Sequence, residues 1–79
     1  MGGWVAKEDW ERRDKAIELL EEARGILEEV YEEIEDRISN MEEYFSSSPV
    51  IDQLESRKET IENAMGFIED AISELEGME

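Results

Sequence analysis

Carboxylates recur at every seventh residue through the first half of this sequence, and they are its most numerous groups that can do chemistry. One line is unbroken over five residues: Asp14, Glu21, Glu28, Glu35 and Glu42. Its neighbour holds four acids and one base: Lys15, Glu22, Glu29, Asp36 and Glu43. Residues seven apart lie on one face of a helix, so the lines predict a strip of negative charge. Such a strip is either a solvated surface or a surface that binds a basic partner. We take the five acidic residues of the first line, Asp14, Glu21, Glu28, Glu35 and Glu42, as the candidate partner-binding residues.

Other uses of these carboxylates are disfavoured. A calcium loop needs alternating Asp or Asn ligands around a glycine, and none appears. A glycosidase pair needs a cleft, which two helices hardly supply. The chain contains no Cys and no His, which excludes disulfides, Cys/His zinc sites, haem ligation by His and nucleophile–imidazole catalysis. The sequence therefore predicts a protein that is not an enzyme and has no metal and no cofactor.

The basic residues are few, and two of them, Arg24 and Lys58, stand where the helical pattern calls for an apolar side chain. The structural interpretation is that they extend to the surface and pair locally, for instance Arg24 with Glu28 or Glu21. The functional alternative is a pocket for an anionic ligand, formed between subunits by Arg24, Arg57, Lys58 and Tyr31. There an aromatic ring stacks on a nucleotide base and arginine binds its phosphate.

The formal net charge of −16, from 24 acidic and 8 basic residues, argues against direct binding to nucleic acid or to an anionic membrane surface. No apolar run approaches the ~20 residues that span a bilayer. The N-terminus, from Met1 to Trp4, lacks the basic and apolar segments of a signal peptide. We expect a cytoplasmic protein.

A serine cluster and the single proline divide the chain into two elements that position these residues. Pro49 fits the first position of a helix capped by Ser48, and Gly77 is a suitable stop. We predict one all-α domain over residues 1–79, with an N-terminal arm at 1–8, a helix at 9–45, a turn at 46–49 and a second helix at 49–77.

Both segments follow the seven-residue repeat whose core positions, called a and d, are mostly apolar. The residues at these positions include the charged Arg13, Arg24 and Lys58. In the first segment they are Trp10, Ile17, Arg24, Tyr31, Ile38 and Phe45 at a, and Arg13, Leu20, Leu27, Ile34 and Met41 at d. In the second they are Ile51, Lys58, Met65 and Ile72 at a, and Leu54, Ile61, Ile68 and Leu75 at d. The pattern predicts an antiparallel two-helix hairpin. Folding it about residues 47–48 places Arg24 near Ile72 and leaves Trp4, Val5 and Trp10 beyond the second helix.

A second apolar line on the first helix predicts that the hairpin assembles further. Ala16, Leu19, Ala23, Ile26 and Val30 lie about 110° round from the a/d seam, and a helix with two apolar stripes needs two neighbours. The second helix has a smaller counterpart in Ala64, Phe67 and Ala71. The five residues on the first helix, together with Trp10, are the candidate oligomer interface. We expect a homo-oligomeric helical bundle. Dimerisation also raises the charge density to about one per 2 Å, close to the ~1.7 Å of duplex DNA.

The stretch from Ala16 to Glu76 resembles small acidic helical proteins encoded by phages and prophages. The segments that carry the resemblance are Ala23-Arg24-Gly25-Ile26-Leu27-Glu28-Glu29 and Ile61-Glu62-Asn63-Ala64-Met65-Gly66-Phe67-Ile68-Glu69-Asp70-Ala71-Ile72. The resemblance implies an accessory protein that acts in the host-cell cytoplasm. Such proteins bind and block a host or defence component, or sequester a nucleotide signal.

Together these features predict a non-catalytic, phage-type binding protein. Its acidic surface is expected to block a basic, nucleic-acid-binding site on a host or defence protein. Two alternatives remain open: an oligomeric sponge that sequesters a nucleotide signal in an inter-subunit pocket, and a structural helical oligomerisation module.

Overall fold

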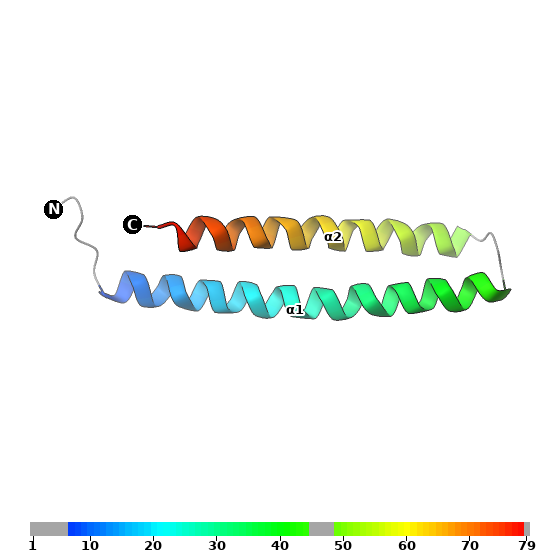
Figure 1. Ribbon diagram of the computed structural model, residues 1–79, viewed down its shortest axis with the longest axis horizontal. Coiled ribbons are helices and arrows are strands. Elements are labelled where there is room, and N and C mark those ends of the chain that lie inside the picture. The colour runs from blue at the N-terminus through cyan, green and yellow to red at the C-terminus, as the bar shows by residue number, and fades with distance from the viewer. Residues whose placement is uncertain (1–6, 45–48, 79) are drawn as a thin grey trace.

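A computed structural model (Figure 1) describes residues 7–44 and 49–78, without the side chains of residues 43 and 44. These residues form two helices, α1 (Lys7–Tyr44) and α2 (Pro49–Glu76), and no strand. The predicted core residue Phe45, the turn at 46–48 and the arm residues Trp4 and Val5 lie outside the described residues.

The ends of the helices follow from local sequence. Acidic residues stand in each first turn, at the positive end of the helix dipole: Glu8 and Asp9 in α1 and Asp52 in α2. The last turn of α2 is closed by the amide of Gly77, which donates to the carbonyl of Ser73 at 3.1 Å. No glycine in the described residues has a positive φ. Gly77 therefore follows the helix without the left-handed conformation that usually favours glycine there.

The two helices lie side by side, with the start of α1 beside the end of α2 (Figure 1). Arg13 reaches the carbonyl of Leu75, and Arg24 lies 3.9 Å from Glu69. The sequence-based register placed Arg24 near Ile72, and the carboxylate that Arg24 contacts lies within about one helical turn of that residue. The packing of a and d layers, and not the midpoint of the turn, determines which residues are level with each other.

The core is small and lies mostly near the turn. Its buried residues are Ile34, Ile38, Ile51, Leu54 and, further along α2, Ile72. All five stand at predicted a or d positions, which confirms the seam there. No described side chain is completely buried. The other described a and d residues are only partly buried, and three of them, Arg13, Arg24 and Lys58, are charged.

The molecule is a thin rod with principal extents of 64 × 16 × 12 Å. Its radius of gyration is 18.5 Å, whereas a compact domain of this length measures about 12 Å. Its accessible surface is 6192 Å², against about 4,900 Å² for a compact protein of the same mass. Over the residues that the structure describes, neither helix has an apolar stretch long enough to cross a membrane.

Candidate functional site

One long edge of the rod carries carboxylates from both helices. In paired heptad helices the e positions, which follow a by four residues, border the same side of the seam. The α1 residues there are the predicted partner-binding line Asp14, Glu21, Glu28, Glu35 and Glu42. The α2 residues, which the sequence analysis did not single out, are Glu55, Glu62, Glu69 and Glu76. All nine are exposed, and we call them the acidic edge.

The contacts between the helices agree with this placement. Glu35 and Glu42 of α1 and Glu55 of α2 line one open depression of about 190 Å³. Lys58 lines it as well, with Ile38 and Ser39. Carboxylates from the two helices thus face a common trough, and nearby cations must limit their mutual repulsion.

Arg24 and Lys58 supply those cations from core positions. Arg24 Nη1 lies 3.9 Å from Glu69 Oε1, and Lys58 Nζ lies 3.5 Å from Glu35 Oε2. Both side chains are about one-third exposed, at 34% and 30%, so their stems lie in the seam while their charged ends reach the edge. The expectation that Arg24 pairs locally with Glu28 or Glu21 is wrong, because its carboxylate partner comes from α2.

Lys58 also contacts an aromatic ring. Its Nζ lies 5.3 Å from the centre of the Tyr31 ring. Partial burial lowers the pKa of Lys58, but Coulombic attraction to Tyr31, Glu35 and Glu55 and a hydrogen bond to Glu35 outweigh this. The pKa of Lys58 is therefore raised above its ordinary value.

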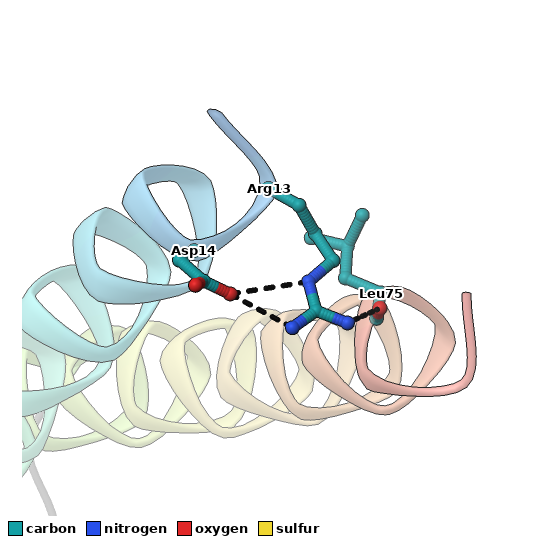
Figure 2. A network of polar contacts seen from close by, with 3 residues as sticks. All are labelled: Arg13, Asp14 and Leu75. Atoms are coloured by element: carbon teal, nitrogen blue, oxygen red, sulfur yellow. Dashed lines mark hydrogen bonds and ion pairs between the residues drawn. The ribbon is translucent and has the colours of Figure 1, made fainter. Parts of the chain in front are cut away.

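Arg13 ties the start of α1 to the end of α2 (Figure 2). Its Nε and Nη2 donate to Asp14 Oδ1 at 3.2 and 2.8 Å, and its Nη1 donates to the Leu75 carbonyl at 3.3 Å. That carbonyl is in the last turn of α2 and also accepts a hydrogen bond from the Met78 amide at 3.2 Å. The guanidinium also lies 4.7 Å from the centre of the Trp10 ring. Trp10, a predicted oligomer-interface residue, is thus only partly exposed in the single hairpin.

The opposite face of the rod carries apolar residues and a second depression. The predicted interface residues Ala16, Leu19, Ala23, Ile26 and Val30 stand at positions g and c, which lie on the other side of the seam from e. Ala64, Phe67 and Ala71 of α2 stand at the same positions and share this face. We call these eight residues the apolar face. Its larger side chains are open to solvent: Leu19 is 52% exposed, Ile26 55% and Phe67 73%. Val30, in contrast, packs against the core.

The second depression lies beside the apolar face and has a volume of about 420 Å³. Its walls come from both helices: Val30, Glu33, Ile34 and Arg37 of α1, and Leu54, Ser56, Arg57, Thr60 and Ile61 of α2. Thr60 donates its hydroxyl to the Ser56 carbonyl at 3.1 Å. The depression therefore combines an apolar floor with two guanidinium groups.

Of the predicted ligand-binding set, the structure brings Lys58 and Tyr31 together and places Arg24 on the same acidic edge. Arg57 lies on the other face with Arg37, a residue that sequence reasoning missed. Both arginines stand at g, so pairing the two heptad patterns would have found them. Within one chain the four predicted residues do not form a single pocket.

The arrangement suits binding through charge or apolar contact. Among the described residues, no group of three or more acidic side chains is placed to hold a metal ion. Comparison of the chain with protein-family models, with curated proteins and with solved structures found no match in any of the three.

Proposed function

We propose that this chain is a non-catalytic binding protein, an antiparallel hairpin that assembles with copies of itself and binds a basic surface through its acidic edge. The partner is a host or defence protein whose nucleic-acid-binding site is blocked, as the resemblance to small acidic phage proteins implies. The observation that supports this best is the acidic edge itself, with nine exposed carboxylates in two rows along the rod.

The spacing of the two rows fits a basic groove. Within each row the carboxylates are about 10.5 Å apart along the helix axis, and packed helix axes lie about 8–10 Å apart. Two rows of negative charge on either side of a trough are a coarse imitation of two phosphate strands. Arg13, Arg24 and Lys58 offset three of the nine carboxylates, Asp14, Glu69 and Glu35, so the edge remains negative.

A second candidate, capture of a nucleotide between copies, is supported by the depression that Arg37 and Arg57 line. The two functions use opposite faces of the rod. They therefore depend on different residues, and substitution separates them. A purely structural oligomerisation module would depend on the apolar face alone.

The test compares two triple variants. Glu28→Gln, Glu35→Gln and Glu42→Gln neutralise three residues of the acidic edge. The matched control, Glu22→Gln, Glu29→Gln and Asp36→Asn, removes the same charge from the neighbouring line of the same helix. Gln is nearly as good a helix former as Glu, so the edge variant keeps its helix. A partner captured from bacterial lysate by the unmodified protein is identified by native mass spectrometry and then titrated with each variant.

The edge variant is expected to bind that partner at least ten-fold more weakly, and the control less than three-fold. Duplex DNA should displace the protein from its partner, since both compete for one basic site. Equal losses in both variants would show that total charge matters and the edge does not. Loss of binding on Arg37→Ala with Arg57→Ala, and not in the edge variant, would favour nucleotide capture.

A further inference from the structure

The face that holds the apolar residues is electrically neutral, although the molecule is not. Among described side chains at positions g and c, the acids are Asp9, Glu33 and Glu74, and the basic residues are Arg12, Arg37 and Arg57. Three charges of each sign cancel, while the whole chain carries −16. Two copies with this charge repel each other over most of their surface. This face is where that repulsion is smallest.

Two of these basic residues have no carboxylate partner among the residues that the structure describes. Of the eight basic residues, six form ion pairs: Lys7, Arg12, Arg13, Lys15, Arg24 and Lys58. Arg37 and Arg57 form none with the described residues, and both line the depression beside the apolar face. In a chain with three times as many acids as bases, the arrangement leaves two cations available to a group from outside.

The charges are also unevenly distributed along the rod. Glu33, Arg37 and Arg57 lie toward the turn and sum to +1. Asp9, Arg12 and Glu74 lie toward the open end of the hairpin and sum to −1. The apolar block around Ile26 and Phe67 stands between them. From the turn to the open end of the hairpin, the face is therefore first positive, then apolar, then negative.

We propose that a second copy of this chain docks on the apolar face about a two-fold axis near Ile26 and Phe67, with the two turns at opposite ends of the assembly. This inference rests on the self-assembly included in the proposed function and specifies its geometry. The axis brings the positive end of each copy onto the negative end of the other. It places Arg37 and Arg57 within about one helical turn of the level of the partner copy's Glu74, and within about two turns of the level of its Asp9.

The opposite arrangement, with both turns at the same end, is disfavoured by the same charges. It stacks like ends on each other and gathers four guanidinium groups around one depression. Like charges in close contact across an interface oppose association.

The available area is sufficient for a stable dimer. A rod 64 Å long and 16 Å wide presents roughly 1,000 Å² on one face, above the ~800 Å² per partner of a standard interface. Docking removes Leu19, Ile26 and Phe67 from water, the larger exposed side chains of this face. It also compensates for the surface that the thin hairpin leaves uncovered.

Spin-label distances test the orientation. The chain has no cysteine, so Ser39→Cys and Glu11→Cys each provide a unique label on the outward side of α1. In the proposed dimer, two Ser39→Cys labels are about 45 Å apart, while a mixture of the two variants adds a second distance of about 25 Å from the dimers that carry one label of each kind. The arrangement with turns together reverses this order: about 25 Å for Ser39→Cys alone and about 45 Å or more for the mixture. That reversed result would overturn the proposal.

Charge reversal tests the contacts. Arg37→Glu with Arg57→Glu, and separately Asp9→Arg with Glu74→Arg, should each weaken dimerisation at least ten-fold in sedimentation equilibrium. Each double variant repels its own copies. An equimolar mixture should recover affinity to within three-fold of the unmodified protein, because the reversed ends attract. Circular dichroism checks that each variant is helical.

Three results would overturn the proposal: a monomer at 100 μM, full dimerisation of the Arg37→Glu/Arg57→Glu variant, and no recovery in the mixture. A monomer that binds pyrophosphate only while both arginines are present would assign the depression to a small anion. Loss of partner capture in the edge variant, with dimerisation intact, would leave this inference standing. The failure of one proposal is thus distinguishable from the failure of the other.

Discussion

Arg24 and Lys58 occupy a positions, and the fold accepts them because their long stems reach the acidic edge. Without them, e-position carboxylates of α1 and α2 would border the same trough with no cation between. Each forms an ion pair across the seam and not along its own helix. Exposed ion pairs contribute little individually. Their larger effect is on register, since each cation is level with one carboxylate of the other helix.

The raised pKa of Lys58 predicts how stability depends on alkaline pH. A lysine whose pKa is higher in the folded state contributes stability that is complete below its unfolded value, near 10.4. That contribution is lost as the pH rises through the higher folded value. The melting temperature should therefore fall from about pH 10.4 upward. The melting temperature of the Lys58→Arg variant, which stays charged, should fall less over the same pH range. Thermal unfolding followed by circular dichroism measures this. Identical pH profiles for the two proteins would contradict this.

At the scale of the helix, much of the fold is predictable from the seven-residue repeat. The repeat identifies the two helices, and all five buried core residues stand at its a and d positions. It does not determine the register, because the geometry of the connection between the helices is not known from the sequence. The residues that lie level with each other are therefore predictable only to within about one helical turn. The α2 row of the acidic edge and Arg37 were missed for a different reason. They become part of a site only when the e or g positions of both helices are considered together.

Two helical glycines predict gains in stability. A Cβ at Gly25 or Gly66 meets nothing within 4 Å, and both stand at outward b positions. Gly25→Ala and Gly66→Ala should each stabilise the protein by about 0.5–1 kcal/mol, since alanine loses less backbone entropy in a helix. Chemical denaturation measures this.

Gly77→Ala is the matched control for these two substitutions. Its Cβ would meet the carbonyls of Ser73 and Glu74 at 3.5 and 3.6 Å, which are ordinary van der Waals contacts. Because Gly77 follows the helix and is not part of it, little change is expected. A loss of stability at Gly25 or Gly66 would show that something packs closely on the b side of the hairpin.

The apolar face predicts a separable loss of assembly. Leu19→Glu with Ile26→Glu should abolish dimerisation while most of the helical signal remains, because both side chains are already more than half exposed in the single hairpin. The control adds the same charge elsewhere, with Ser39→Glu and Asn63→Glu, and should keep the dimer. Sedimentation velocity distinguishes the two. If both variants dissociate equally, charge alone governs assembly and the apolar contact does not.

For the whole molecule, the charge imbalance predicts that salt stabilises the fold. With a net charge of −16, repulsion exceeds the contribution of the six exposed or half-exposed ion pairs. Raising sodium chloride from 20 to 500 mM should increase the melting temperature by about 5 °C, which corresponds to roughly 1 kcal/mol for a domain of this size. The Glu28→Gln, Glu35→Gln, Glu42→Gln variant should show a smaller increase. A melting temperature that falls with salt would show that the ion pairs dominate.

The two rows of the acidic edge have a repeat that nearly equals the distance over which salt screens charge. Successive carboxylates in a row are about 10.5 Å apart, and the Debye length is about 10 Å at 0.1 M ionic strength. In dilute buffer the fields of neighbouring carboxylates overlap into a continuous line of negative charge, and a basic partner of the proposed kind would have no preferred position along it. In concentrated salt the fields of the carboxylates no longer overlap, and the proposed partner would be held only where its basic groups match their interval. The heptad repeat that builds the core thus also sets the ionic strength, about 0.1 M, at which this edge changes from a continuous line of charge to a row of separate charges.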